Sequence, residues 1–457
     1  MKFAIIGYSS HLPNGSSVSS TWNSILEGKN SIEDISEDRL NVGAYYDPDP
    51  KILDKTYCKR GGFIPPYNFI PRNYNMNIMQ LEDCDSNQLL SLKKVSDCLK
   101  NAGLPLKEKK NMGCILGIGG GQKIGFELQR RMGWANLQEV LNKSGLPDND
   151  IINIIEKFKA HFPMYRLDSF PGSLGNVVSG RIAKTFNLNG MNCVVDAACA
   201  SSHSALRMAM DEIRCGNCDT MITGSTCTDN SITMYMSFSK TPVFTKEKNL
   251  CAYDEKSSGM LIGEGSVMFI IKRLDYAERD NNKIYAVINS CTASSDGSNT
   301  SGIYTPSVEG QMLAYERAYK NAGISPEKVT MLEGHGTGTK KGDLIELTGM
   351  SNFFKNCNKE QIAVGSIKSN IGHLKACAGF AGMLKAVLSL QHKCLPMTIN
   401  CDNPSLDNMG PLYINTDNRP WITLNNEPRV AGISAFGFGG TNWHTVISEY
   451  EHEHVKL

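Results

Sequence analysis

One cysteine lies where its sulfur could act as a nucleophile. Cys199 falls between a β-branched pair, Val194–Val195, that predicts the end of a buried strand, and apolar residues at helical spacing from Ala205 onwards. A thiol at the start of a helix faces unpaired N–H groups and the positive end of the helix dipole, and both favour the thiolate. The small residues around Cys199 leave room for an acyl group. The alternative is a buried structural cysteine, the commoner environment of a free cysteine.

Two histidines in later loops favour the nucleophile over the structural cysteine. His335 lies in the run Gly-His-Gly-Thr-Gly-Thr at the end of a predicted strand, and His373 ends the loop Lys-Ser-Asn-Ile-Gly-His before a predicted helix. A third loop, residues 436–442, places aromatic rings among glycines, which let a backbone approach a ligand closely. A cysteine and two histidines at strand-to-loop junctions predict a convergent nucleophilic site.

The composition argues against several other kinds of protein. The 457 residues include 47 Lys and Arg against 46 Asp and Glu, and this net charge of +1 predicts neither a nucleic-acid nor a membrane partner. The chain has no run of 18 apolar residues, and its first residues lack the pattern of a signal peptide. The fifteen cysteines are scattered and mostly single, which predicts reduced thiols, no metal site and a cytoplasmic location.

The order of predicted elements indicates the fold class. Strands alternate with helices along most of the chain, which predicts an α/β protein whose sheets are covered by helices. The pattern restarts near residues 275–283, so we expect two similar halves, 1–274 with Cys199 and 275–457 with both histidine loops. Residues 122–163 are expected to be a helical insertion in the first half.

These motifs identify a family resemblance. The sequence resembles the β-ketoacyl synthases, condensing enzymes with the thiolase fold, over residues 3 to 450. The motifs that carry it are Asp-Ala-Ala-Cys-Ala-Ser-Ser (196–202), Gly-His-Gly-Thr-Gly-Thr (334–339), Lys-Ser-Asn-Ile-Gly-His (368–373) and Gly-Phe-Gly-Gly-Thr-Asn (437–442). Further segments, at 55–64, 168–176 and 234–242, are most similar to the synthase domain of polyunsaturated-fatty-acid synthases and related iterative polyketide synthases. The resemblance implies two similar halves with mixed sheets, layered α-β-α-β-α.

The resemblance also implies a reaction, acyl transfer followed by decarboxylative Claisen condensation in fatty-acid or polyketide biosynthesis. Cys199 would accept the growing acyl chain from a phosphopantetheine thiol. His335 and His373, as neutral imidazoles, would hold the thioester carbonyl of a malonyl extender while carbon dioxide leaves. The backbone N–H groups of Cys199 and Phe438 would form the oxyanion hole.

Other residues would support this chemistry. Lys368 would pair with Glu346 and order the histidine loops, with Asp343 in the same supporting role. Phe438 would gate the acyl pocket. The residues expected to touch the substrate or its pantetheine arm are Thr337, Thr339, Phe436, Gly439 and Asn370.

The partners implied are an acyl carrier protein and a second copy of the chain, and the chain would need no cofactor of its own. Residues 184–195 have the pattern of an edge strand, and an unpaired sheet edge is a liability unless it is covered. Antiparallel pairing with its copy would close this edge and place Met191 to Val195 near a two-fold axis. The helical segment 122–163 could pack over the same interface.

Some residues depart from the family pattern. Ala200 replaces the Ser that usually follows the nucleophile, and Lys341-Gly-Asp-Leu344 replaces a Leu-Gly-Asp-Pro pattern. His203 lies four residues after Cys199, and we interpret it as a helix-face residue outside the chemistry. The alternative function is a non-condensing homologue that transacylates, decarboxylates or acts as a chain-length partner. Such homologues lack the cysteine or a histidine, whereas all three residues are present here.

Overall fold

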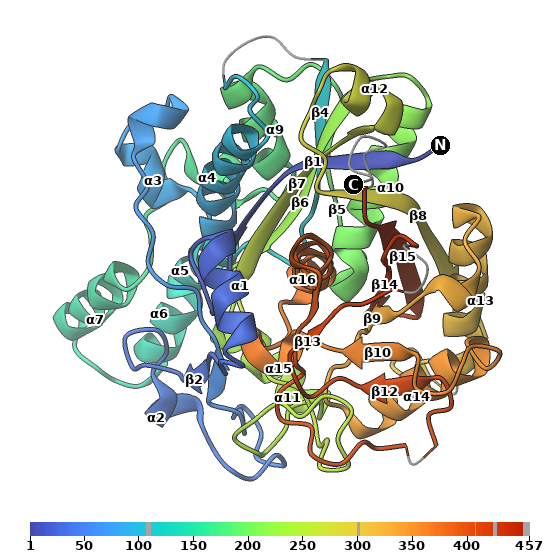
Figure 1. Cartoon of the computed structure of the whole chain (residues 1–457). Helices are drawn as coiled ribbons and strands as arrows, with labels where there is room; N and C mark the ends of the chain where they lie inside the picture. The colour runs from blue at the N-terminus through green and yellow to red at the C-terminus, as the bar shows by residue number, and fades with distance from the viewer. Residues whose placement is uncertain (107–110, 299–301, 407, 424–426, 451–457) are drawn as a thin grey trace.

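A mixed sheet of 11 strands forms the centre of the molecule (Figure 1). The computed structural model describes residues 1–106, 111–298, 302–406, 408–423 and 427–450. The strands lie in the order β12-β10-β9-β14-β15-β8-β1-β7-β6-β4-β5. The first half of the chain contributes β1 (Phe3–His11), β4 (Met112–Gly117), β5 (Asn192–Val195), β6 (Thr220–Cys227) and β7 (Gly265–Arg273). The second half contributes β8 (Ala286–Ser295), β9 (Met331–Glu333), β10 (Ile362–Gly365), β12 (Leu412–Ile414), β14 (Val430–Gly437) and β15 (Thr441–Ser448).

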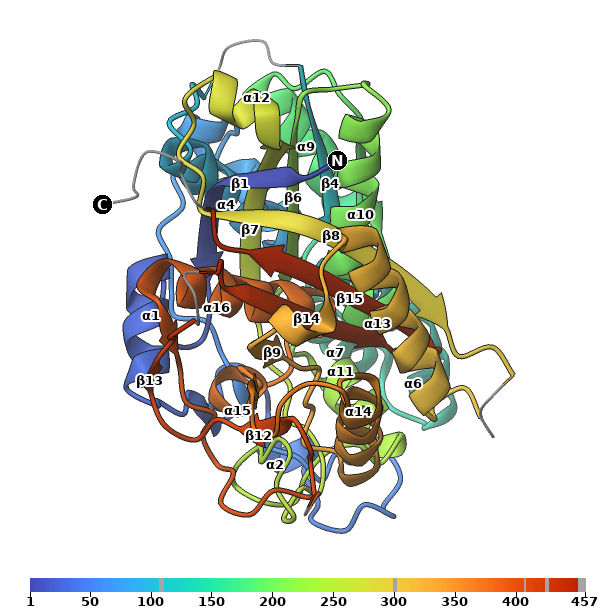
Figure 2. The ribbon, with the colours of Figure 1, turned by 45° about the vertical axis from the view of Figure 1, so that its right-hand side comes forward.

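The two halves repeat one strand order. On one side of the sheet, β1 pairs antiparallel with β7 and β7 with β6, after which β6 pairs parallel with β4 and β4 with β5. On the other side, β8 pairs antiparallel with β15 and β15 with β14, after which β14 pairs parallel with β9 and β9 with β10. The two sets meet where β1 pairs antiparallel with β8, visible in Figure 2, so both halves share one continuous sheet. The strand order on the second side of the sheet therefore repeats that on the first.

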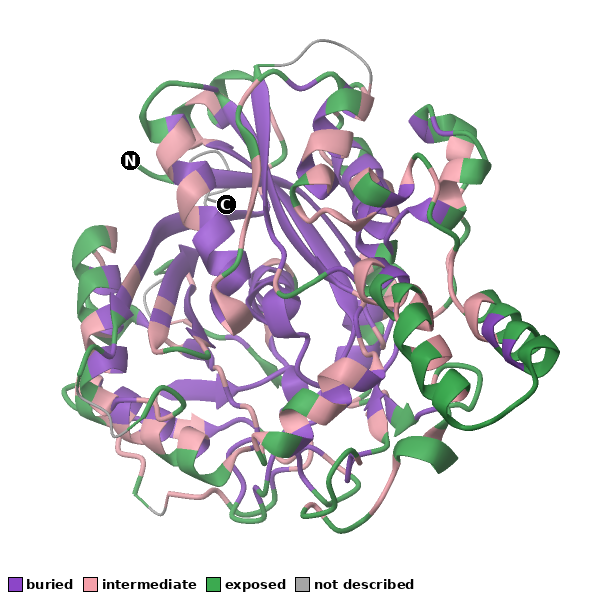
Figure 3. Ribbon diagram, turned by 180° about the vertical axis from the view of Figure 1, so that it is seen from behind, coloured by how far each residue is buried: buried purple, intermediate pink, exposed green. Residues whose placement is uncertain are grey.

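Helices form three layers around this sheet. Two buried helices, α10 (Ser201–Arg214) and α16 (Ala378–His392), contact each other between the halves, α10 against β4 and β6 and α16 against β14. Every residue of α16 from Ala378 to Leu390 is buried, as the purple helix at the centre of Figure 3 shows. Outside them, α4 (Ser86–Asn101) and α9 (Asn176–Phe186) cover one half, and α13 (Val308–Ala322) and α14 (Lys340–Phe353) cover the other. The layering is α-β-α-β-α, as the family resemblance implied.

Residues 122–163, where a helical insertion was expected, contain three helices, α5 (Lys123–Met132), α6 (Trp134–Lys143) and α7 (Asp148–Ala160). They lie at one side of the molecule, at the left of Figure 1, and α6 buries none of its residues.

The remaining elements are short or peripheral. They are α1 (Val18–Leu26), α2 (Val42–Tyr45), α3 (Met79–Asp83), α8 (Ser169–Ser173), α11 (Ile232–Lys240), α12 (Leu274–Arg279) and α15 (Lys368–Ile371), the 3-10 helices η1 (Pro71–Tyr74), η2 (Ala198–Ala200), η3 (Pro326–Lys328) and η4 (Lys375–Cys377), and the strand pairs β2 (Ile32–Asp34) with β3 (Arg60–Gly62) and β11 (Cys394–Leu395) with β13 (Arg419–Pro420). Among the described residues, no helix is both long enough and apolar enough to cross a membrane.

Candidate active site

Cys199 lies at the N-terminal end of the buried helix α10, where the sequence placed it. After β5 the chain turns through Asp196, whose carboxylate accepts the backbone N–H groups of Ala198 at 2.9 Å and Gly120 at 2.9 Å. Ala198 adopts a left-handed conformation with φ of 51°, a strained state that is maintained when neighbouring contacts determine it. This turn carries Cys199 into the short helix η2 and then into α10.

The protonation state of Cys199 differs from the prediction. Burial raises the pKa of the thiol above its ordinary value. The backbone N–H groups of Phe438 and of Cys199 itself and the charges of Lys368 and Lys375 lower the pKa but do not overcome burial. The expected preference for thiolate is therefore wrong for the resting protein, because removing a thiolate from water costs more than the nearby N–H groups and lysine charges return.

The His335 ring is held by backbone contacts. Its Nδ1 accepts the backbone N–H of Phe436 at 3.3 Å, and the backbone N–H of His335 itself donates to Glu346 at 2.6 Å. Burial lowers the pKa of His335 well below its ordinary value, and the charge of Lys368 acts in the same direction. His335 is therefore neutral at pH 7, with its proton on Nε2.

His373 repeats the arrangement between α15 and η4. Its Nδ1 accepts the backbone N–H of Lys375 at 2.9 Å, and its carbonyl accepts the N–H of Gly263 at 2.9 Å. Burial lowers the pKa of His373 well below its usual range, with Lys368 and Lys375 adding to the effect. The two histidine rings lie 5.5 Å apart at an interplanar angle of 85°. The site thus presents two neutral Nε2–H donors, the groups that can stabilise a negative oxygen.

Two buried carboxylates shape the first histidine loop. Glu346 accepts the N–H groups of His335 at 2.6 Å and Gly336 at 2.7 Å, and the hydroxyl of Tyr253 at 2.9 Å. Asp343 accepts three backbone N–H groups: Tyr253 at 2.7 Å, Thr337 at 3.0 Å and Gly338 at 3.2 Å. Burial raises the pKa of Asp343 to about 7.

The predicted pair of Lys368 with Glu346 does not form. Lys368 is 3% exposed, and among the ion pairs of the described residues none joins it to a carboxylate within 4.0 Å. Glu346 is already occupied by the donors of the histidine loop. The buried ion pair of this region instead joins Glu333 to Lys385 at 2.8 Å, and Glu333 also accepts the N–H of Ile367 at 2.7 Å. A single lysine inside the apolar sequence of α16 was the signal for this pair.

A cavity of about 510 Å³ brings most of the predicted residues together. Its wall includes Cys199, His335, His373, Thr337, Thr339, Asp343, Glu346, Phe436, Phe438 and Gly439. The hydroxyls of Thr337 and Thr339 lie 2.9 Å apart, and the apolar part of the wall includes Met234, Phe238, Val243 and Met260. Phe438 is 47% exposed and its ring lies 4.7 Å from that of Tyr304.

Two residues are not where the prediction placed them. Asn370, expected to touch substrate, is fully buried outside the cavity wall and donates to the carbonyl of Lys29 at 3.1 Å. Lys368 is likewise absent from that wall. The physical reason for Asn370 is that α15 turns its side chain towards the loop after α1, a contact between distant segments.

His203 belongs to the helix contact rather than to the cavity. It is fully buried with its ring 6.0 Å from Phe380 of α16, and burial lowers its pKa to about 3. A Cβ added at Gly379 would come within 2.4 Å of the ring, so only glycine allows this approach. His203 thus lies on a helix face, as interpreted from the sequence.

Comparison with known proteins identifies the family of the chain. The family model of the β-ketoacyl synthase N-terminal domain matches residues 2–277, and the model of the β-ketoacyl synthase C-terminal domain matches residues 285–402. The chain is 54% identical to a polyunsaturated fatty acid synthase polypeptide of Thraustochytrium sp., covering 100% of this chain and 17% of that protein. It is 33% identical to polyketide synthase PksL of Bacillus subtilis, covering 98% of this chain and 9% of that protein. The chain therefore spans only a small part of these relatives.

Solved structures are also similar over nearly the whole chain. The ketosynthase from module 6 of the bacillaene synthase of Bacillus subtilis 168 superposes with a TM-score of 0.82 at 30% identity, over 99% of this chain and 73% of that chain. The PfaC keto synthase–chain length factor superposes with a TM-score of 0.87 at 30% identity, over 98% of this chain and 48% of that chain. The chain belongs to the β-ketoacyl synthase family, as a ketosynthase of the acyl-transferring, condensing kind found in polyunsaturated-fatty-acid and polyketide synthases.

Proposed function

We propose that this chain elongates acyl groups by acyl transfer to Cys199 followed by decarboxylative Claisen condensation with a malonyl extender. The observation that carries this proposal is one cavity lined by a thiol and by two neutral Nε2–H imidazoles. Neither half-reaction needs a metal or a cofactor resident in the chain.

The first half-reaction transfers the acyl group. The Cys199 sulfur attacks the carbonyl of an acyl thioester, a new C–S bond forms, and the pantetheine thiolate leaves and takes up the proton of the Cys199 thiol. The tetrahedral oxygen would be held by the backbone N–H groups of Cys199 and Phe438, both of which already lower the pKa of the Cys199 thiol.

The second half-reaction forms the carbon–carbon bond. The bond to the malonyl carboxylate breaks, carbon dioxide leaves, and the electron pair forms an enolate on the extender thioester. His335 and His373 would donate Nε2–H to the enolate oxygen. The enolate carbon then attacks the Cys199 thioester and expels the Cys199 thiolate, which is reprotonated.

The substrates would arrive on the phosphopantetheine arm of an acyl carrier protein. The hydroxyls of Thr337 and Thr339 line the cavity and could contact the arm, and exposed Phe438 stands where it could gate entry. The 54% identical relative favours polyunsaturated-fatty-acid synthesis as the pathway. The fifteen cysteines are all free, which supports a reducing, cytoplasmic compartment.

The test is intact-mass spectrometry of the chain after incubation with a panel of acyl-carrier thioesters. We expect one acyl group per chain, lost in Cys199→Ala and retained in Cys227→Ala, because Cys227 is a second thiol in the same cavity wall. An acyl group that peptide mapping places on another cysteine would refute the assignment. Loading and carbon dioxide release without a β-keto product would identify the non-condensing homologue instead.

A further inference from the structure

A lysine close to His373 has a place in the site that none of the roles above uses. Lys375 is 9% exposed, lines the cavity, and adopts a left-handed conformation with φ of 53°. A bulky side chain rarely takes this conformation unless its surroundings determine it. Its backbone N–H is the donor that occupies Nδ1 of His373 at 2.9 Å.

The side chain of Lys375 completes a ring of hydrogen bonds around His373. Its Nζ donates to the carbonyl of Gly263 at 2.7 Å and to Oδ1 of Asn230 at 2.7 Å. The N–H of Gly263 in turn donates to the carbonyl of His373 at 2.9 Å. Lys375 therefore holds His373 from two directions, directly through its backbone and through Gly263 by its side chain.

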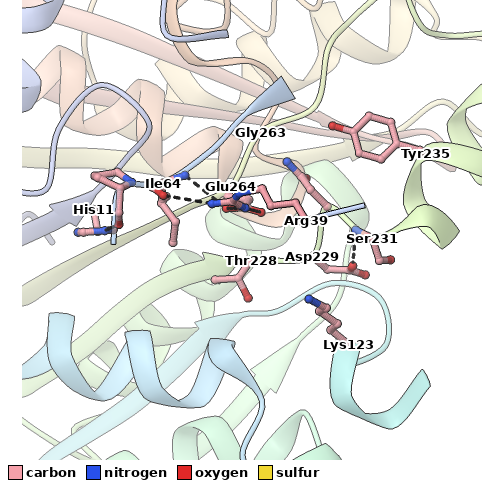
Figure 4. Close-up of polar contacts among 12 residues, drawn as sticks. His11, Arg39, Ile64, Lys123, Thr228, Asp229, Ser231, Tyr235, Gly263 and Glu264 are labelled. Carbon is pink, nitrogen blue, oxygen red and sulfur yellow. Dashed lines mark hydrogen bonds and ion pairs between the residues drawn. The ribbon is translucent and has the colours of Figure 1, made fainter. Parts of the chain in front are cut away.

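The segment around Gly263 is itself fixed, as Figure 4 shows. Glu264 accepts the guanidinium of Arg39 at 3.0 Å and the backbone N–H of Ile64 at 3.3 Å. The N–H of Glu264 donates to the carbonyl of Gly62 at 2.9 Å. Gly263 therefore lies in a segment that hydrogen bonds hold to Arg39, Gly62 and Ile64.

The charge of Lys375 is not neutralised by contact. In the part of the chain that the structure describes, no carboxylate lies within 4.0 Å of its Nζ. Among the described residues, the titratable and charged groups that interact with Lys375, Cys199 or His373 include Cys227 of β6, Cys377 of η4, Glu264, Lys368 and His335. Asp229, in the loop after β6, acts on Cys227. A cation held at this place without a carboxylate in contact acts on both the nucleophile and the histidine.

We propose that Lys375 is a positioning residue for condensation, which fixes His373 as an Nε2–H donor and places a positive charge beside Cys199. The proposal rests on the proposed function for the reaction it serves, whereas its effect on Cys199 can be measured without any condensation. Burial raises the pKa of Cys199, and Lys375 is one of the groups that oppose the rise. The same charge adds to burial in lowering the pKa of His373.

The test compares Lys375→Met with Lys393→Met. Lys393 is a matched control, because it also has a left-handed backbone, with φ of 51°, while its side chain is 63% exposed. Both variants carry the same conformational cost, but only the first removes the contacts around His373. A third variant, Lys375→Arg, keeps the charge.

Two readouts separate positioning from general stability. The first is alkylation of Cys199 by iodoacetamide as a function of pH, followed by peptide mapping. Without the charge the pKa of Cys199 rises, so the Lys375→Met profile moves to higher pH, while Lys375→Arg and Lys393→Met follow the wild type.

The second readout is carbon dioxide release from a malonyl-carrier thioester. We expect kcat to fall about ten- to hundredfold in Lys375→Met with KM within about twofold, since small misplacements of a reacting geometry cost this much.

The pH dependence of carbon dioxide release shows in which direction Lys375 shifts the pKa of His373. Removing Lys375 lets the pKa of His373 rise, so His373 becomes protonated at a higher pH and the acid limb of the Lys375→Met profile moves towards neutrality. An alkylation profile and acid limb that match the wild type would overturn the proposal. If the wild type itself released no carbon dioxide, the proposed function would fail, while the alkylation arm would still decide the role of Lys375. If Lys375→Met does not fold, the same two profiles are measured on Lys375→Gln, where a match to the wild type would equally overturn the proposal.

Discussion

At His335 and His373 a backbone N–H decides which ring nitrogen carries the proton. Because Nδ1 of each ring is an acceptor, both rings are directed to donate through Nε2. Burial keeps both rings neutral, so each keeps one N–H, at Nε2, that is free to donate to a substrate oxygen. At the scale of the residue, the chemistry depends on desolvation as much as on residue identity.

The two half-reactions should therefore separate in a histidine variant. His335→Ala removes one of the two donors to the enolate but leaves Cys199 in place. We expect acyl loading to persist, while carbon dioxide release falls about 10²- to 10³-fold, as when one oxyanion donor is lost elsewhere. Loading is measured by intact mass and carbon dioxide release by a coupled assay. Condensation at the wild-type rate would show that His335 is structural.

Lys368 and Lys385 offer a second comparison between single residues. Burial disfavours the charged form of Lys368 and lowers its pKa, and no carboxylate of the described residues lies within 4.0 Å of the side chain. We therefore expect Lys368→Met to keep or raise the thermal midpoint of unfolding while it lowers activity. Lys385→Met is the matched control, since it leaves Glu333 buried and uncompensated, a change that costs about 3–5 kcal/mol. Calorimetry of both variants tests this order. A lower midpoint for Lys368→Met than for Lys385→Met would contradict it.

At the scale of elements, the contact of α10 with α16 joins the two catalytic halves. The helix that starts behind Cys199 packs on the helix that follows His373, and both are buried between the halves of the sheet. Gly379 and His203 set the closeness of this contact. A shift of either helix would move Cys199 relative to His373.

This contact should make stability depend on pH through His203. Its pKa is about 3 in the folded chain and about 6.5 when unfolded. Below pH 6.5 the unfolded chain therefore binds a proton that the folded chain does not, so stability is lost as pH falls. From pH 7.5 to pH 5 the loss from this group is about 2 kcal/mol.

Urea unfolding of the wild type and of His203→Phe measures the effect. The difference in unfolding free energy between the two proteins should shift by that amount in favour of the variant as the pH falls. Because the comparison concerns the slope with pH, it holds even if the larger ring lowers stability at every pH. Parallel pH profiles would show that His203 titrates normally.

At the scale of the whole molecule, the sheet has an open edge at β5. This strand pairs on one side with β4, Asn192 is exposed and the remaining residues are half-buried. Met191 beside it is 43% exposed. Further exposed apolar residues lie in the segment before α9: Met164, Tyr165, Leu167 and Phe170. An open edge next to exposed apolar side chains is the pattern of a surface that pairs with a second copy.

We therefore expect a stable homodimer at micromolar concentration, with Met191 to Val195 near the two-fold axis. Obligate interfaces of this kind bury over about 2,000 Å². Met191→Lys places a charge at the edge and should weaken the dimer. Ile422→Lys, at a residue 77% exposed outside this edge, is the control and should not. Light scattering that reports a monomer for the wild type would contradict the assembly.

The sequence by itself selected Cys199, His335 and His373 as candidate site residues and predicted an α/β fold, whose layering the family resemblance implied. Cys199, His335 and His373 stand in local motifs at the ends of strands, and the alternation of elements is enough to predict where strand ends meet. These features depend on residues close together in the chain.

The tertiary structure alone decided how buried charges pair and how the site is protonated. Glu333 forms an ion pair with Lys385, and the expected pair of Lys368 with Glu346 is absent from the described residues. The side chain of Asn370 lies outside the cavity and donates to Lys29. The thiol of Cys199 is protonated because desolvation, which depends on everything packed around it, outweighs the nearby N–H groups and lysine charges. Such outcomes are set by contacts between segments far apart in the chain, and no local pattern encodes the solvent exposure on which they depend.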